Sequence, residues 1–99
     1  MFTTLRIYAG APGVAARIAA KREDVEKMFR GIPGFAGYRL IDLADSFASV
    51  TICETKDGCE QSAKAAAAFL REKLPEVAVP APHVITGESL LSFGAKPSR

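Results

Sequence analysis

Hydrophobic and polar residues alternate from residue 2 to residue 9, in the stretch FTTLRIYA. This alternation places Phe2 and Tyr8 on one side of an extended chain and Leu5 and Ile7 on the other, which predicts a β-strand. Three later stretches also have strand-like patterns, and they span residues 35–43, 47–54 and 83–93. The chain is therefore expected to contain four strands.

The first predicted helix lies over residues 14–32, where apolar side chains recur at near-helical spacing and charged residues cover most of the remaining surface. This pattern predicts one amphipathic helix. We expect Gly31 to end it in the left-handed conformation. Pro33 and Gly34 then fit the two middle positions of a type II turn. Gly37, inside the next strand, indicates a bulge or a close approach by another backbone.

A second helix is expected after the third strand. Asp57 and Glu60 are spaced like a capping box, and Pro75 ends the helix. The element order is then β-α-β-β-α-β, which is the order of an α+β, ferredoxin-like sandwich with an antiparallel sheet. We expect a single domain over residues 1–94 and a loose tail over residues 95–99.

Apolar residues are expected on both faces of this sheet. In the strand over residues 35–43, the pattern places Phe35 and Ile41 on one face and Tyr38 and Leu40 on the other. Two helices can cover only one face of a four-stranded sheet. A chain of 99 residues, 48% of them hydrophobic, has apolar surface to spare. The sequence therefore predicts a homodimer in which a second copy covers the other face.

Charge and cysteine content narrow the class of protein. The net charge is +2, from 13 basic and 11 acidic residues, which predicts neither a nucleic-acid partner nor a membrane partner. We expect no signal peptide and no bilayer-spanning segment. Cys53 and Cys59 lack metal-ligand spacing and fall on different predicted elements, so we expect a reduced, cytoplasmic protein.

Three stretches carry a resemblance to a known family. GIPGFAGYRLI joins a helix end to a strand, SFASVTICET precedes a helix that contains Gln61-Ser62-Ala63, and VITGESLL comes late in the chain. Over residues 2–93 the sequence resembles the dimeric α+β-barrel superfamily, in particular its antibiotic-biosynthesis-monooxygenase-like branch. The resemblance implies two facing sheets that close a barrel, and a cavity that lies between each sheet and its helices or reaches into the barrel. Some members oxidise aromatic polyketides without a cofactor and others degrade haem. These members commonly use an asparagine and a tryptophan, and this sequence contains neither.

Arg6, Tyr8 and Arg39 are the first candidate catalytic residues. If their side chains converge in one cavity, two guanidinium groups can hold a carboxylate or phenolate, and the tyrosine can donate or accept a proton. The alternative is that both arginines form structural ion pairs with acids such as Glu54 or Glu88. The second interpretation is the simpler one.

His83 and Cys59 are further candidates. His83 is the only histidine and could act as a general base or haem ligand, although its place at the start of an end strand is more typical of a structural residue. Cys59 falls in the first turn of a predicted helix, where the helix dipole favours a thiolate, but a small buried cysteine is the commoner outcome. We predict no metal site and no cofactor, because no ligand cluster or nucleotide fingerprint is present.

These observations lead to one main hypothesis for function. It is a homodimeric α+β-barrel protein with cofactor-independent, monooxygenase-like activity on a small aromatic or carbonyl compound. The alternative is a non-catalytic dimer that binds a small ligand or has a structural role. An RNA-recognition module shares the element order, but the strand over residues 47–54 lacks the aromatic pattern on which such modules stack bases.

Overall fold

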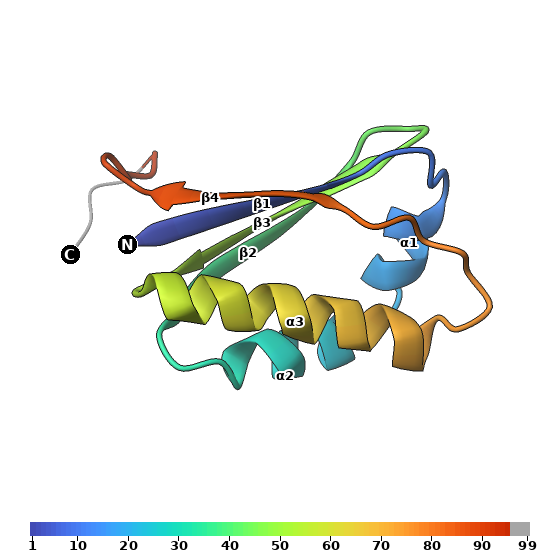
Figure 1. The fold of residues 1–99 in the computed structure, drawn as a ribbon, viewed down its shortest axis with the longest axis horizontal. Helices are drawn as coiled ribbons and strands as arrows, with labels where there is room; N and C mark the ends of the chain where they lie inside the picture. Colours follow the sequence, from blue (N-terminus) through green and yellow to red (C-terminus); the bar gives the residue numbers. More distant parts are fainter. Residues whose placement is uncertain (96–99) are drawn as a thin grey trace.

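Four antiparallel strands form one sheet in the order β2-β3-β1-β4, and three helices cover one of its faces (Figure 1). The computed structural model describes residues 1–95. Its elements are β1 (Phe2–Tyr8), α1 (Val14–Ala19), α2 (Arg22–Arg30), β2 (Phe35–Asp42), β3 (Phe47–Cys53), α3 (Lys56–Lys73) and β4 (His83–Glu88). The α+β, ferredoxin-like arrangement predicted from the sequence is confirmed. No helix within these residues is long and apolar enough to cross a membrane.

The predicted alternation of β1 is confirmed. Arg6 and Tyr8 are buried beneath the helices, whereas Leu5 and Ile7 are exposed. We call the covered side the helix face and the other side the open face. Residues that pair across neighbouring strands lie on the same face, so the registers assign the residues of β2, β3 and β4 to one face or the other. The open face carries Leu5, Ile7, Arg39, Ile41, Ala48, Val50, Ile52, His83 and Ile85.

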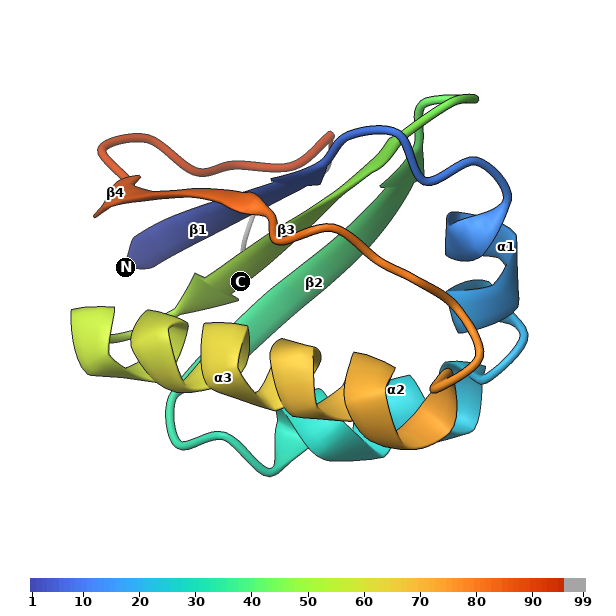
Figure 2. The ribbon, with the colours of Figure 1, turned by 45° about the vertical axis from the view of Figure 1, so that its right-hand side comes forward.

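The single helix expected over residues 14–32 is two helices in the structure. The chain turns at Ala20 and Lys21, where the backbone of Lys21 leaves helical geometry (φ −105°, ψ 36°). A straight helix of that length would extend for nearly 30 Å in one direction. The turn lets α1 stand at one end of the sheet while α2 lies beneath it (Figure 2). Both segments then bury their apolar residues, which include Ile18 and Phe29.

The turn into β2 was predicted correctly in part. Gly34 has φ +77°, and the amide of Phe35 donates to the carbonyl of Ile32 at 3.1 Å, as expected for the type II turn. Gly31, however, is right-handed, with φ −78°. A left-handed residue is not needed at Gly31, because the amide of Ile32 donates to the carbonyl of Phe29 and the helix ends in a tight turn. The chain reverses its direction only afterwards, at Pro33-Gly34.

The predicted bulge in β2 is confirmed and changes one assignment. The register with β3 shifts between Phe35 and Gly37. Because the extra residue moves the chain by one position, Phe35 lies on the same side as Tyr38 and not opposite it. The rings of Phe35 and Tyr38 both stack on Phe29 of α2, at centroid distances of 6.0 and 4.2 Å. These rings form much of the core.

The remaining differences concern element ends. The N-cap of α3 is Thr55, whose hydroxyl accepts from the amide of Gly58 at 3.0 Å, and not the predicted pair Asp57 and Glu60. Asp57 instead accepts from Gln61 within the helix. β4 ends at Glu88, five residues before the expected end. Of the tail predicted over 95–99, residues 96–99 lie outside the described part of the chain.

Candidate functional site

The helix face of β1 holds a buried arginine. Arg6 is 1% exposed, although a charged side chain is seldom buried without a partner. Its terminal nitrogens donate to Thr51 Oγ1 at 3.0 Å and Ser62 Oγ at 3.3 Å. The guanidinium carbon lies 5.9 Å from the centre of the Phe29 ring, within cation–π range. β3, α3 and α2 thus hold this side chain in place.

Arg6 has no acidic partner among residues 1–95. The ion pairs of residues 1–95 join Arg17 to Glu76 and Arg30 to Glu26, and both are exposed. The structural ion pair considered from the sequence is therefore wrong for Arg6. The hydroxyls of Thr51 and Ser62 are neutral acceptors, and Ser62 also donates to the carbonyl of Cys59 at 2.6 Å. Within the described part of the chain, the positive charge is therefore buried without a compensating negative one.

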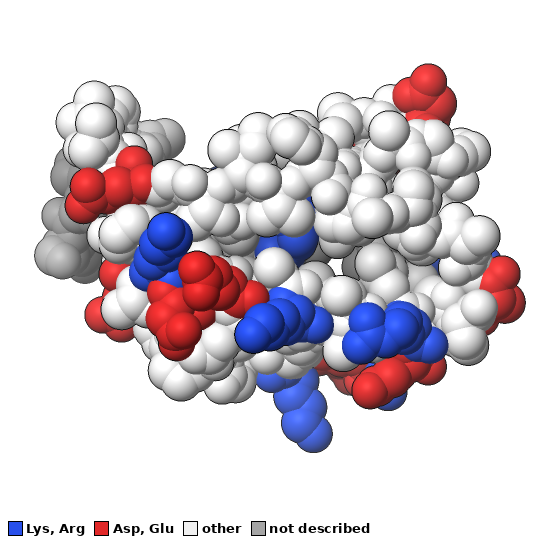
Figure 3. Space-filling model, in the orientation of Figure 1, with Lys and Arg blue, Asp and Glu red and all other residues white. Residues whose placement is uncertain are grey.

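A groove of about 440 Å³ reaches this arginine from the surface. It opens between α3 and the segment that leads into β4, and atoms of a basic residue are visible at its floor (Figure 3). Arg6 and Tyr8 lie at the inner end, and Arg71 contributes the other charged side chain. The remaining lining is apolar: Ala63, Ala67, Leu70, Leu74, Pro75, Val77, Val79, Pro80, Ala81, Pro82 and Val84. The groove can hold a small, largely apolar molecule.

A second, much smaller cavity lies on the inner side of Arg6. It has a volume of about 20 Å³, and its polar lining residues are Arg6, Tyr8, Tyr38 and Ser49. Arg6 Nε and Ser49 Oγ are both buried and have no hydrogen-bond partner in the part of the chain that the structure describes. Ser49 is the direct neighbour of Arg6 across the β1–β3 ladder. Two unsatisfied polar groups thus line one cavity.

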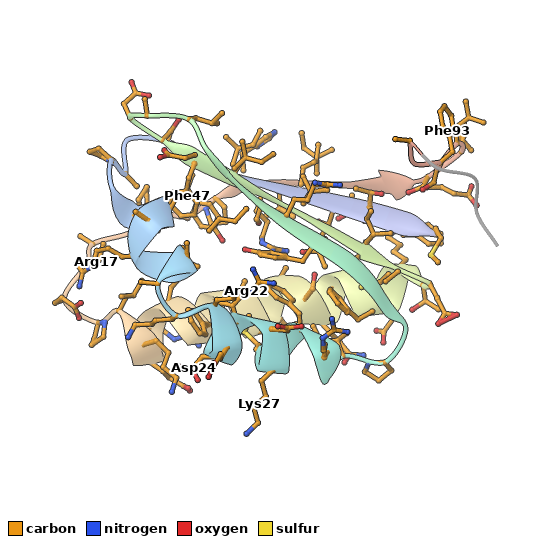
Figure 4. All side chains as sticks on the ribbon, turned by 180° about the vertical axis from the view of Figure 1, so that it is seen from behind. Arg17, Arg22, Asp24, Lys27, Phe47 and Phe93 are labelled. Atoms are coloured by element: carbon orange, nitrogen blue, oxygen red, sulfur yellow. The ribbon has the colours of Figure 1, made fainter. Side chains whose placement is uncertain are left out.

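The tyrosines at this site are protonated at neutral pH. Burial raises the pKa of Tyr8, and the neighbouring Arg6 guanidinium offsets part of the rise. Burial also raises the pKa of Tyr38 to about 12. The ring of Tyr8 is stacked on that of Phe47 at 4.4 Å, which holds it against the end of the sheet near α1 (Figure 4). Both phenols can donate a proton in a hydrogen bond, and neither is a general base at rest.

The four predicted site residues divide between the two faces. Arg6 and Tyr8 share the groove on the helix face, as their positions in one strand suggested. Arg39 and His83 are exposed on the open face. Convergence of Arg39 with Arg6 and Tyr8, which the sequence left conditional, therefore does not occur within one chain. Arg39 also has no ion pair within residues 1–95.

Sequence reasoning missed Ser49, Thr51, Ser62 and Tyr38. One signal was available: in SFASVTIC, the residues at every second position from Phe47 to Cys53 are buried, and they include two hydroxyls. Small polar residues on the buried face of a strand indicate a polar partner inside the protein. The contribution of Ser62 depends on how α3 crosses the sheet, which the alternation of a strand cannot reveal.

Both cysteines are buried and free, the commoner outcome considered from the sequence. Cys59 Sγ donates to the carbonyl of Phe2 at 3.4 Å. Burial, with Cys59 as a neighbour, raises the pKa of Cys53 to about 11, so this thiol is protonated at neutral pH. Within residues 1–95 no group of three or more His, Cys, Asp or Glu side chains is arranged to hold a metal ion.

Solved structures with the same architecture include proteins of known and unknown activity. A protein of unknown function from Nitrosomonas europaea superposes with a TM-score of 0.70 and 13% identity, over 97% of this chain and 95% of that one. The ActVA-Orf6 monooxygenase of Streptomyces coelicolor, in complex with nanaomycin D, gives a TM-score of 0.68 and 16% identity over 96% and 92%. The haem-degrading protein MhuD of Mycobacterium tuberculosis, with two haems in its active site, gives 0.64 and 20% over 95% and 100%.

The chain has the fold of these proteins. The resemblance to antibiotic-biosynthesis-monooxygenase-like proteins noted in the sequence is thus confirmed at the level of the fold. No protein-family model matches the sequence, and a comparison with curated proteins finds no match either. At identities of 13 to 20% for the three superpositions, the shared fold does not transfer a reaction.

Proposed function

We propose that this protein is a homodimeric, cofactor-independent monooxygenase that acts on a small aromatic or carbonyl compound bound in the Arg6 groove. The observation that carries the proposal is the groove itself, which leads from the surface to a buried arginine and a protonated tyrosine. The monooxygenase from Streptomyces coelicolor, in complex with nanaomycin D, provides a precedent for a bound ligand in this fold.

The proposed chemistry uses the charge of Arg6. A substrate with an acidic ring methylene conjugated to a carbonyl loses a proton to solvent water at the open end of the groove and becomes an enolate, and the guanidinium stabilises that anion in a site of low dielectric. The enolate then gives electrons to O₂. One oxygen atom becomes the new carbonyl, and the other leaves as water with the two hydrogens of the methylene. Tyr8 supplies a hydrogen bond to the developing oxyanion.

The homodimer is part of the proposal, because the open face carries several exposed apolar side chains. Leu5, Ile7, Ile41 and Ile85 are each 36 to 47% exposed. Beyond β4, Leu90, Leu91 and Phe93 are 84 to 88% exposed, and Phe93 lies beyond the sheet on the side away from the helices (Figure 4). A second copy that packs its own open face here would cover both sets and close the two sheets into a barrel. One solved structure with the same architecture is described as a dimeric ferredoxin-like protein.

Haem does not fit the Arg6 groove. The groove offers no histidine, cysteine or methionine as an axial ligand, and His83 lies on the open face. Tyr8 is the one remaining candidate ligand, and its raised pKa keeps the hydroxyl protonated. Haem degradation, known for MhuD, is therefore not proposed for this chain. A cytoplasmic location remains part of the proposal, and the two buried, unbridged cysteines are compatible with a reducing compartment.

Oxygen consumption tests the proposed activity. Purified protein is incubated in air with anthrone, which has an acidic methylene, and with a panel of quinol-type aromatics. We expect oxygen uptake above the buffer rate, with a fall in kcat/KM of about 10- to 100-fold in Arg6→Met, the range for loss of one hydrogen-bonded charge. Arg71→Met is the matched control, since it removes a charge at the rim of the same groove. No uptake with any compound would contradict the enzymatic proposal.

The alternative is a dimer that binds a small ligand without chemistry. It is favoured by the small number of titratable groups in the groove, where the arginines and Tyr8 are the only ones. Saturable binding of an aromatic compound, with no oxygen uptake and no change in the compound after incubation, would select this alternative.

A further inference from the structure

The buried guanidinium of Arg6 has the surroundings of an anion site. Its positive charge persists throughout the physiological pH range. Its partners in the described chain are two hydroxyl oxygens and an aromatic ring, none of which carries a charge. A buried charge without a counter-charge is costly, and proteins retain such groups where a ligand supplies the opposite charge.

Two free donors point to where that opposite charge would lie. Arg6 Nε and Ser49 Oγ are both buried and unpartnered, and both residues line the small cavity on the inner side of the guanidinium. The volume of about 20 Å³ suits one oxygen atom, since a single water needs about 10–15 Å³. A negatively charged oxygen here would accept from both groups and would face the protonated hydroxyls of Tyr8 and Tyr38.

The larger groove indicates what is attached to that oxygen. The small cavity and the groove share Arg6, Tyr8 and Leu70, so they are adjacent. Apart from Arg6, Tyr8 and Arg71, every residue that lines the groove is apolar, and both charged residues are cationic. An apolar body therefore fits the groove, while a second anionic group could be tolerated only at the outer end, near Arg71.

We propose that the site selects an amphipathic monoanion. A carboxylate or phenolate oxygen lies between Arg6 Nε and Ser49 Oγ, and an apolar, ring-sized body extends along α3 toward the surface. This inference rests on the proposed ligand groove but not on the proposed oxidation. It names a property of the bound ligand, a negatively charged oxygen at one end, that neither the fold nor the resemblance supplies.

Calorimetric titration with two isosteric probes tests the charge requirement. 2-Naphthoate and 2-naphthamide share the same ring system and differ in charge. We expect naphthoate to bind about 10- to 100-fold more tightly than naphthamide, as estimated for a buried, charge-assisted hydrogen bond. 4-Nitrophenol, titrated at a pH above its pKa, extends the test to a phenolate. If it binds and naphthoate does not, a phenolate replaces the carboxylate in the proposal.

Substitutions test which side chain gives the site its preference for the negatively charged probe. Arg6→Met is expected to remove the preference for naphthoate and to leave the affinity for naphthamide within about threefold. Ser49→Ala is expected to reduce naphthoate binding by about three- to tenfold, the range for one hydrogen bond. Arg71→Met removes the other cation of the groove and is expected to weaken naphthoate binding less than Arg6→Met does, because an exposed charge contributes little. Circular dichroism checks that each variant is folded.

Three results would overturn the inference. Equal affinities of the wild-type protein for naphthoate and naphthamide would mean that a buried water satisfies both donors, and this comparison needs no variant. An equal loss in Arg71→Met and Arg6→Met would replace a specific site by a general electrostatic attraction. A preference for naphthoate over naphthamide that survives in Arg6→Met would show that Arg6 is not the group that meets the charge of the ligand. Absence of oxygen uptake together with naphthoate selectivity would contradict only the proposed oxidation.

Discussion

Arg6 lies on the buried face of β1, in the core, where a charged side chain is seldom found. The residues on either side of it in the same row, Ser49 and Val84, are small or apolar. Desolvation of a guanidinium costs several kcal/mol, and its two neutral acceptors return only part of that cost. In the absence of ligand, Arg6 should therefore lower stability. A residue that opposes folding and lines a groove is best explained by binding.

This reasoning gives a prediction for the ligand-free protein. Arg6→Met replaces the charge by an apolar chain of similar length, so we expect the free energy of unfolding to stay equal or to rise by about 1–4 kcal/mol. Urea denaturation monitored by circular dichroism provides the measurement. Arg17→Met, which removes an exposed ion pair with Glu76, is the control and should change stability by less than about 1 kcal/mol. A loss of more than about 2 kcal/mol in Arg6→Met would identify a structural role for the charge.

The buried thiol and phenol predict a loss of stability at alkaline pH. The pKa of Cys53 is raised from 9.0 to about 11, and that of Tyr38 from 10.0 to about 12. The unfolded chain therefore releases these protons at lower pH than the folded one, so unfolding becomes easier as pH rises from about 9 toward 12. A shift of two units corresponds to about 2–3 kcal/mol for each group.

Denaturation measured at a series of pH values tests this sign. We expect a falling free energy of unfolding over that window in the wild-type protein and a shallower fall in Tyr38→Phe, which removes the ionisable group and keeps the ring against Phe29. Stability that is constant from pH 9 to pH 12 would show that the two groups are less buried than their environment indicates.

At the scale of the element, the turn between α2 and β2 is the most constrained connection. Gly34 and Gly13 both have φ +77°, so alanine is strained at either position. At Gly34 an added Cβ would also come within 3.2 Å of Glu54 Cβ, whereas at Gly13 nothing lies within 4 Å. The two sites thus form a matched pair that differs in contact but not in backbone strain.

We expect Gly13→Ala to lower the free energy of unfolding by about 1–2 kcal/mol through strain alone. Gly34→Ala should cost more, by about 1 kcal/mol or above, because the turn must move away from β3. Chemical denaturation of both variants gives the comparison. Equal losses of stability in the two variants would mean that the chain at Glu54 moves aside for the added Cβ at no cost in free energy.

Periodicity predicted the elements better than the contacts between them. The strands, the order of elements and the Gly34 turn follow from local chemistry that the sequence displays directly. The division between α1 and α2 does not, because no glycine or proline marks Lys21 and the spacing from Ile18 to Val25 fits an unbroken helix. The face of Phe35 was misassigned because a bulge reverses parity at a position that alternation alone cannot locate.

The candidate site shows the same division. Arg6 and Tyr8 could be placed together because they are two residues apart in one strand, and side chains at that spacing share a face. Arg39 and His83 could not be excluded in advance, since their faces depend on the registers of β2 and β4. Ser62 required knowledge of how α3 crosses β1. Chemistry confined to one strand was predictable, whereas chemistry assembled from several elements was not.

At the scale of the whole molecule, the two faces of the sheet have different roles. The helix face holds the core, the groove and the unpaired charge. The open face is largely apolar, with Arg39 and His83 near its edges, and Leu5 lies between Val50 and Ile85 at its centre. If a second copy covers this face, Arg39 and His83 become interface residues, so the division between the faces separates assembly from ligand binding.

Leu5→Asp tests whether a second copy covers the open face. A carboxylate at the centre of an apolar interface would be desolvated without a partner, so we expect the wild-type dimer to dissociate to monomers. Light scattering coupled to size-exclusion chromatography measures the mass. Ala16→Asp, an equivalent change at an exposed position of α1, is the control and should leave the dimer intact. A well-folded wild-type protein that remains monomeric in dilute solution would contradict the proposed assembly. A monomeric Leu5→Asp that still prefers naphthoate to naphthamide would show that each chain carries a complete binding site.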